Sequence, residues 1–182
     1  MPCKFDASAN IREGLKQDIL WLLIANYSYK ERAQLERLNQ WSWKRLGTEL
    51  VLLESVVRDI VSRITALDDS TKNNRSFQTL FTAMKREGLD SARSKKIDIK
   101  VKVYRRSVNE LKVSHRNHYI SHVGTNASVQ PRVVDEPVAF IDATSKAVNL
   151  LDYIEEMTIP YYFQLGSDQK IDLRMELANT IS

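Results

Sequence analysis

The three histidines of this chain, His115, His118 and His122, lie within one stretch of eight residues. Imidazole exchanges protons near neutral pH, so such a cluster beside an arginine points to acid–base chemistry. Arg116 can hold the non-bridging oxygens of a phosphate through its planar fork, His122 can remove or donate a proton, and Asn117 can orient either partner. RNA carries its own nucleophile, the 2′-hydroxyl, so this set predicts phosphodiester cleavage without a metal.

Two other interpretations of the histidines are open. His118 and His122 have the i, i+4 spacing with which two imidazoles on one helix reach a zinc ion, and His115 lies one turn earlier. No glutamate lies between these two histidines, so a zinc site would need a carboxylate from another helix. Alternatively, each imidazole packs on the interior and hydrogen-bonds through its nitrogens. The preferred interpretation is phosphodiester chemistry, with neither a metal nor a cofactor.

A basic segment leads directly into the histidine cluster. It is diluted only by Asp98 and Glu110, and its cations are Lys95, Lys96, Lys100, Lys102, Arg105, Arg106 and Lys112. A phosphate backbone that approaches the cluster would meet these cations, although an ordinary solvated helix face has a similar composition. The formal net charge of +4 is too small by itself to indicate a nucleic-acid partner.

Apolar residues recur at intervals of three and four along most of the chain, which predicts helices with one buried stripe. We expect helices over about 9–27, over about 30–67 with a bend near Gly47, around Phe77 to Met84 with an end at Gly88, over about 94–122, and from Pro137 to a stop at Pro160. The polar residues 68–74 form the loop after the second helix. The prediction is an all-α fold.

Two segments are ambiguous. Residues 97–103 alternate apolar and polar side chains as a half-buried strand does. The longer series Ile97, Val101, Tyr104, Val108, Leu111, His115, His118 and His122 instead has alternating steps of four and three, so we predict one long helix ended by Gly124, with a connecting loop over 125–132. Near the C-terminus, residues 171–177 fit either a short helix or an edge strand.

Composition limits the class of protein. A chain of 182 residues with 43% hydrophobic side chains suits one domain with a real core and excludes global disorder. The single cysteine cannot form an intramolecular disulfide, and the N-terminus lacks a secretory pattern, so we expect a cytoplasmic protein. The longest apolar run, residues 19–25, is far shorter than a membrane span, and no membrane partner is expected.

Two sets of residues near these elements have a structural interpretation. Arg63 is expected to pair with Asp68 or Asp69 at the end of the second helix rather than to act in catalysis. Trp21, Trp41 and Trp43 fall in helical patterns and are expected in the core or at an interface rather than as platforms for stacked bases.

The segment Arg116-Asn117-His118-Tyr119-Ile120-Ser121-His122 resembles the Arg-polar-x4-His motif of HEPN domains. The similarity is greatest to the U-type abortive-infection branch, which commonly has Arg-Asp-Lys-Tyr-Ile-Ala-His here, so Asn117 and His118 replace the common Asp and Lys. Upstream, residues 62–69 and then 74–77 are similar to the Arg-Leu-x-Asp segment of that branch and the Ser-Leu helix start that follows it. The helix order fits over about residues 9–157, which leaves 161–182 as an extension of a single domain spanning 1–182.

The resemblance implies an all-α, HEPN-like bundle of about five main helices in which the motif lies on a long helix. It also implies a metal-independent RNA endonuclease, a toxin-like component of antiphage or toxin–antitoxin defence that an antitoxin protein could neutralise. Arg116, Asn117 and His122 would be catalytic. His115, His118, Tyr119 and Lys112 would bind the substrate.

The family also implies a homodimer, in which two motifs face each other. Arg116 and His122 are about 120° apart on an ideal helix, so one straight helix does not bring both to one phosphate. Either a second chain or local unwinding before Gly124 would complete the site. Some HEPN proteins are inactive, and the alternative function is therefore a helical dimer that binds RNA, nucleotide or a protein partner without cleavage.

Overall fold

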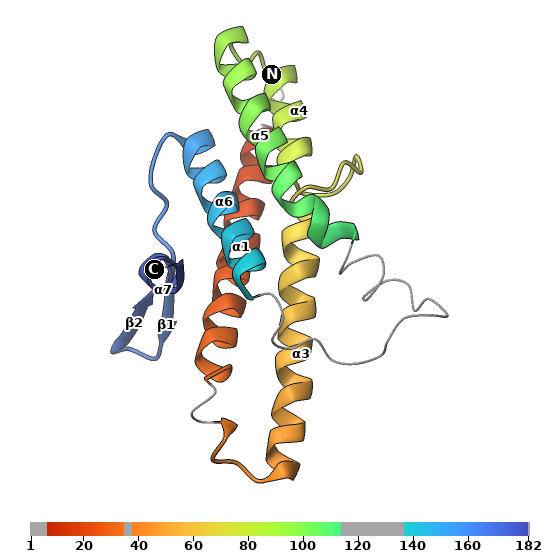
Figure 1. Cartoon of the computed structure of the whole chain (residues 1–182). Helices are drawn as coiled ribbons and strands as arrows, with labels where there is room; N and C mark the ends of the chain where they lie inside the picture. The colour runs from red at the N-terminus through yellow and green to blue at the C-terminus, as the bar shows by residue number, and fades with distance from the viewer. Residues whose placement is uncertain (1–6, 35–37, 114–136, 182) are drawn as a thin grey trace.

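The computed structural model describes residues 7–34, 38–113 and 137–181 of the chain (Figure 1). Its elements are α1 (Ala7–Arg32), α3 (Trp43–Ala66), α4 (Phe77–Arg86), α5 (Ser91–Leu111), α6 (Pro137–Glu155), β1 (Tyr162–Leu165), β2 (Gln169–Asp172) and α7 (Leu173–Ile181). Helices dominate, and the sheet of the described residues is a single antiparallel hairpin of β1 and β2. The predicted all-α bundle is confirmed.

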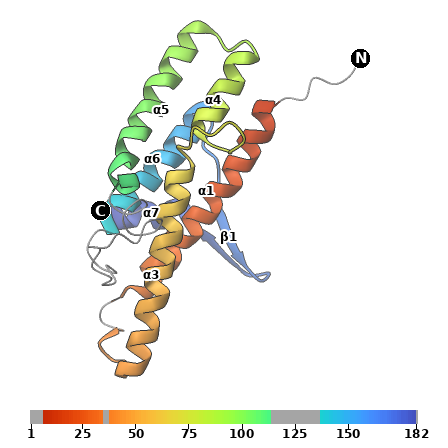
Figure 2. The same cartoon turned by 90° about the vertical axis from the view of Figure 1, so that its right-hand side faces the viewer.

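Five helices build the body of the bundle. α1 and α3 run antiparallel beside each other, and α6 packs against both of them as well as against α5 (Figures 1 and 2). α4 lies against α1 and α5 at one end. Their inward side chains form one hydrophobic cluster, which includes Leu15, Ile19, Leu22, Leu53, Ile60, Ile64, Phe77, Leu80, Ile97, Tyr104, Ala147 and Leu151. The core therefore comes from the apolar stripes that the sequence predicts.

The predicted helix over 30–67 is wrong at its N-terminal end. α1 continues to Arg32, and α3 begins only at Trp43. Ser42 caps α3, because its hydroxyl accepts a hydrogen bond from the backbone N–H of Arg45 at 3.4 Å. Leu38 lies between the two helices and is buried in the core. Leu38 therefore keeps the helical spacing of apolar residues because its side chain packs in the core, and this spacing does not show that one continuous helix runs through the segment.

The short helix α4 and the helical choice for residues 97–103 are confirmed. Ser76 and Thr79 form a reciprocal capping box at the start of α4, and Gly88 follows its end with a φ of +94°. Asp90 caps α5, and the backbone N–H of Arg93 lowers the pKa of the Asp90 carboxyl. Residues 114–122 of the predicted long helix, and the loop predicted over 125–132, lie outside the described residues.

The C-terminal part contains both alternatives that the sequence left open. β2 includes residues 171 and 172, and α7 starts directly afterwards at Leu173. The Asp172 carboxylate accepts hydrogen bonds from the backbone N–H groups of Arg174 and Met175, which begins the helix. α7 buries Leu173 against α1 and α6, on the side of the bundle away from α3 (Figure 1). α6 begins at Pro137 as predicted, but it ends at Glu155, before Pro160.

None of the helices in the described ranges combines the length and the apolar composition that crossing a membrane would require.

Candidate functional site

Most of the predicted site lies outside the described residues. This holds for the three proposed catalytic residues, Arg116, Asn117 and His122, and equally for the proposed substrate contacts His115, His118 and Tyr119. Lys112, the remaining predicted substrate contact, is described and follows directly on the last residue of α5. The structure therefore shows how the residues just before the motif, the end of α5 and Lys112, are held in place.

The ammonium group of Lys112 is bound by a buried carboxylate. Its Nζ lies 2.5 Å from Oδ2 of Asp68 and donates a second hydrogen bond to the Asp68 carbonyl oxygen at 3.1 Å. The Asp68 side chain is fully buried, whereas that of Lys112 is 21% exposed. Gln78 donates to the other carboxylate oxygen at 2.9 Å, and Nε of Arg105 lies 3.7 Å from Oδ2. Asp68 therefore joins α5, α4 and the end of α3.

A buried tyrosine strengthens the same junction. The hydroxyl of Tyr104, on α5, donates to the carbonyl oxygen of Ile64 on α3 at 2.9 Å, and its ring packs edge-on against Phe77. Burial raises the pKa of Tyr104 well above the ordinary value, and the charge of Asp68 raises it further. The phenol thus stays a neutral donor. The C-terminal half of α5 is therefore held to α3 by a hydrogen bond, to Asp68 just after α3 by an ion pair, and to α4 by aromatic packing.

Arg63 has an ion pair, as expected, but with another partner. Its Nε lies 2.7 Å from Oδ2 of Asp59, one turn earlier on α3, and not on Asp68 or Asp69. Asp68 points into the protein toward α5, while Asp69 binds Thr71 and Asn74 in the loop. The predicted pairing was wrong because proximity along the chain does not determine which side of a helix end a carboxylate faces.

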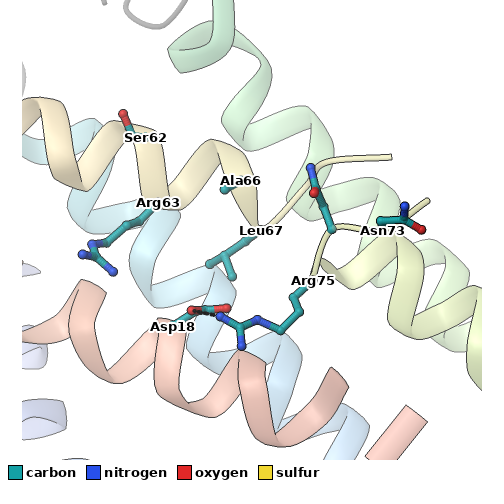
Figure 3. Close-up of a pocket in the computed structure, with 8 residues that line it drawn as sticks. Asp18, Ser62, Arg63, Ala66, Leu67, Asn73 and Arg75 are labelled. Atoms are coloured by element: carbon teal, nitrogen blue, oxygen red, sulfur yellow. Dashed lines mark hydrogen bonds and ion pairs between the residues drawn. The ribbon is translucent and has the colours of Figure 1, made fainter. Parts of the chain in front are cut away.

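A hollow of about 580 Å³ lies where α1, the end of α3 and the following loop meet (Figure 3). Arg75 from the loop lies opposite Asp18 of α1, with 3.1 Å between its Nη2 and the carboxylate Oδ1. The arginine side chain crosses α1 at Gly14, where a Cβ would lie only 2.4 Å from Cδ of Arg75. Sequence analysis missed this contact, although a glycine inside a long helix was a usable signal. Each arginine of the hollow, Arg63 and Arg75, already has a carboxylate partner.

Two of the three tryptophans, Trp21 and Trp43, are not core residues. Trp43 is 88% exposed at the start of α3, and Trp21 is more than half exposed on α1. Trp41 is partly buried, and the guanidinium of Arg45 lies 4.3 Å from its ring centre. Trp21 lines a second hollow of about 480 Å³ between α1 and α3, together with Leu52. The core part of the expectation is therefore wrong for Trp21 and Trp43, while the interface part remains a prediction.

Comparison with known proteins identified no match for this chain, whether among models of protein families, among curated proteins or among solved structures.

Proposed function

We propose that this protein is a metal-independent RNA endonuclease of the HEPN type that acts as a homodimer. The observation that carries the proposal is the spacing Arg116-Asn117-x4-His122, which begins five positions after the end of α5, the most basic helix that the structure describes. The helical fold is compatible with it, because a HEPN domain is a helical bundle.

In the proposed reaction the 2′-oxygen of RNA attacks the adjacent phosphorus, and the bond from phosphorus to the 5′-oxygen breaks. One proton leaves the 2′-hydroxyl and one reaches the departing 5′-oxygen, so two proton transfers are needed. His122 performs one of them, and His122 of a second copy performs the other. Arg116 neutralises the charge that develops on the phosphate, and Asn117 orients the imidazole or the phosphate.

Lys112 supports this proposal in a way that the sequence does not predict. Asp68 binds the ammonium group of Lys112. This ion pair fixes the position of Lys112, from which the chain continues toward Arg116. Its role would be to position the start of the motif segment, with a phosphate contact as a secondary effect of its partial exposure.

The same proposal includes a cellular setting. A nuclease that cleaves cellular RNA must be held in check until it is needed, which fits a toxin-like component of antiphage or toxin–antitoxin defence with a protein antitoxin. The RNA target would place its action in the cytoplasm.

Incubation of the purified protein with a pool of tRNA and mRNA tests the nuclease. We expect cleavage that survives a strong chelator, and loss of cleavage in His122→Ala and Arg116→Ala with unchanged helical content by circular dichroism. His118→Ala is the matched control from the same cluster: it should raise KM and leave kcat nearly unchanged.

Three results would contradict the assignment. Undiminished cleavage by His122→Ala removes the proposed acid–base group. Cleavage that a chelator abolishes and zinc restores assigns the histidines to a metal site. RNA that stays intact while it binds measurably makes the protein an inactive binding dimer.

A further inference from the structure

The positive charge of the protein is concentrated on α5. This helix carries seven Lys and Arg against Asp98 and Glu110, a net charge of +5. The rest of the chain carries 20 Lys and Arg against 21 Asp and Glu, so it is close to neutral. The modest net charge of the whole protein thus conceals one strongly basic element.

Several cations of α5 are already engaged. Arg105 lies near Asp68, and Arg93 binds Glu156 and the carbonyl oxygen of Ile154. Lys100 is exposed, but its ammonium lies over the ring of Tyr153 on α6, 4.3 Å from the ring centre. These contacts fasten α5 to α3, α6 and the residues after α6. They are explained by the fold and indicate no partner.

The remaining cations face solvent. Lys95, Lys96 and Arg106 are exposed, and none of them forms an ion pair with a side chain that the structure describes. Lys102 is exposed as well, and its ammonium is held by Asp98 one turn earlier, at 2.6 Å. Structure therefore separates the basic residues of α5 into those that stabilise the fold and those that are available to a ligand.

Three of the solvent-facing cations form a row. Lys95, Lys102 and Arg106 are separated by seven and four residues, which places them within about 40° of one another along roughly 16 Å of an ideal helix. Ile99, 61% exposed, and Val103, 50% exposed, lie beside them. We call these five residues the outer stripe of α5. The opposite side of the helix is buried against the bundle, and α5 lies at its edge (Figure 2).

We propose that the outer stripe of α5 is a docking surface for the phosphate backbone of RNA. Charge complementarity is the main argument, because lysine and arginine that release counterions from phosphates supply most of the sequence-independent binding energy for nucleic acids. An acidic protein partner fits less well, because lysine is depleted in protein–protein interfaces. The identity of the polyanion rests on the proposed nuclease function. The stripe would hold RNA along α5 beside the segment that carries the motif.

Salt-dependent binding of a fluorescent oligouridylate of about 20 nucleotides tests this surface. The chain carries His122→Ala throughout, so that the RNA stays intact. Each lost contact with a single strand lowers the slope of log Kd against log salt by about 0.7. Lys95→Gln with Arg106→Gln should therefore lower the slope by about 1.4 and weaken binding about 25-fold near 0.1 M salt.

A control with the same change in charge is Lys44→Gln with Lys170→Gln. Lys44 is exposed in the first turn of α3, at the end of the bundle away from α5, and Lys170 is on β2 (Figure 1). This control should keep the wild-type slope. Asp98→Asn should instead tighten binding, by up to about fivefold near 0.1 M salt, because Lys102 becomes free for phosphate. A misfolded variant would not bind more tightly.

Equal slopes for the stripe variant and its control overturn the proposal. So does a stripe that binds polyglutamate but not RNA, which would assign it to an acidic protein. With His122 restored, the stripe variant should raise KM and leave kcat unchanged, and an unchanged KM would refute the surface while the nuclease stands. Binding that depends on the stripe without any cleavage would refute the nuclease while the surface stands.

Discussion

The ion pair between Lys112 and Asp68 holds the residues just before the motif, and its contribution to the free energy of unfolding can be measured directly. In Lys112→Met, the fully buried carboxylate keeps the Gln78 hydrogen bond but loses its closest cation. Removal of one partner of a buried pair costs about 3–5 kcal/mol. Arg105 is more than half exposed and lies 3.7 Å away, so it can move closer and partly replace the lysine. We therefore expect about 3 kcal/mol of destabilisation.

The reverse substitution should cost less. Asp68→Asn preserves the volume and the acceptor for Gln78, and it removes a hydrogen bond between charged groups worth about 1.5–3 kcal/mol. Lys112 keeps the Asp68 backbone carbonyl as an acceptor and, at its partial exposure, also reaches water. The expected loss is about 2 kcal/mol. In the double variant no buried charge is left unpaired, so its loss should be about 2 kcal/mol smaller than the sum of the two single losses.

Urea unfolding followed by far-ultraviolet circular dichroism near neutral pH measures all four proteins of this cycle. Lys102→Met is the matched control, because its pair with Asp98 is exposed on the same helix and should contribute less than about 1 kcal/mol. The proposed role of this ion pair is refuted if the loss of the double variant equals the sum of the two single losses to within about 0.5 kcal/mol. It is also refuted if Lys112→Met loses less stability than Asp68→Asn.

Three further predictions concern stability. Gly14→Ala should change the free energy of unfolding by less than about 1 kcal/mol in thermal melts, because the gain in helix propensity offsets the displacement of Arg75; a larger loss would mean that Arg75 cannot move. The raised pKa of Tyr104 means that the folded protein keeps a proton which the unfolded chain loses, so stability should fall above about pH 10, by up to about 1.4 kcal/mol per pH unit for this group. Urea titrations should show a shallower decline in Tyr104→Phe, and an equal decline in both proteins would exclude this cause. Asn26→Leu should change the free energy of unfolding by less than about 1 kcal/mol in the same titration: it relieves the buried Oδ1, which has no partner among the described residues, but it removes the hydrogen bonds that Nδ2 donates to the Leu22 carbonyl and the Thr144 hydroxyl; a loss above about 2 kcal/mol would contradict this.

The elements that sequence analysis located correctly have local causes. α4 ends before Gly88, whose positive φ suits glycine, and α6 starts at Pro137, whose missing N–H is unneeded in the first helical turn. A local cause also explains the correct prediction of a helix over residues 97–103. The apolar residues that follow this segment repeat with the helical period and not with the strand period. Each of these signals lies within a few residues of the feature that it predicts.

The missed elements depend on distant contacts. α1 ends at Arg32 and α3 begins only at Trp43, yet Leu38 keeps the apolar interval because it packs in the core. The β1–β2 hairpin also escaped prediction, since four-residue strands have almost no period of their own. Gly166, with a φ of +67°, was the available turn signal.

For the candidate site, the sequence by itself determined the residue types that could cleave RNA, their spacing and the basic segment before them. Covalent order and helical period are enough for those statements. Only the tertiary structure decided that Lys112 is bound by Asp68, 44 residues away, and that Lys95 and Arg106 remain available to a ligand. The physical reason is that an ion pair forms between side chains that the fold brings together, and local sequence does not encode which of several nearby carboxylates that will be.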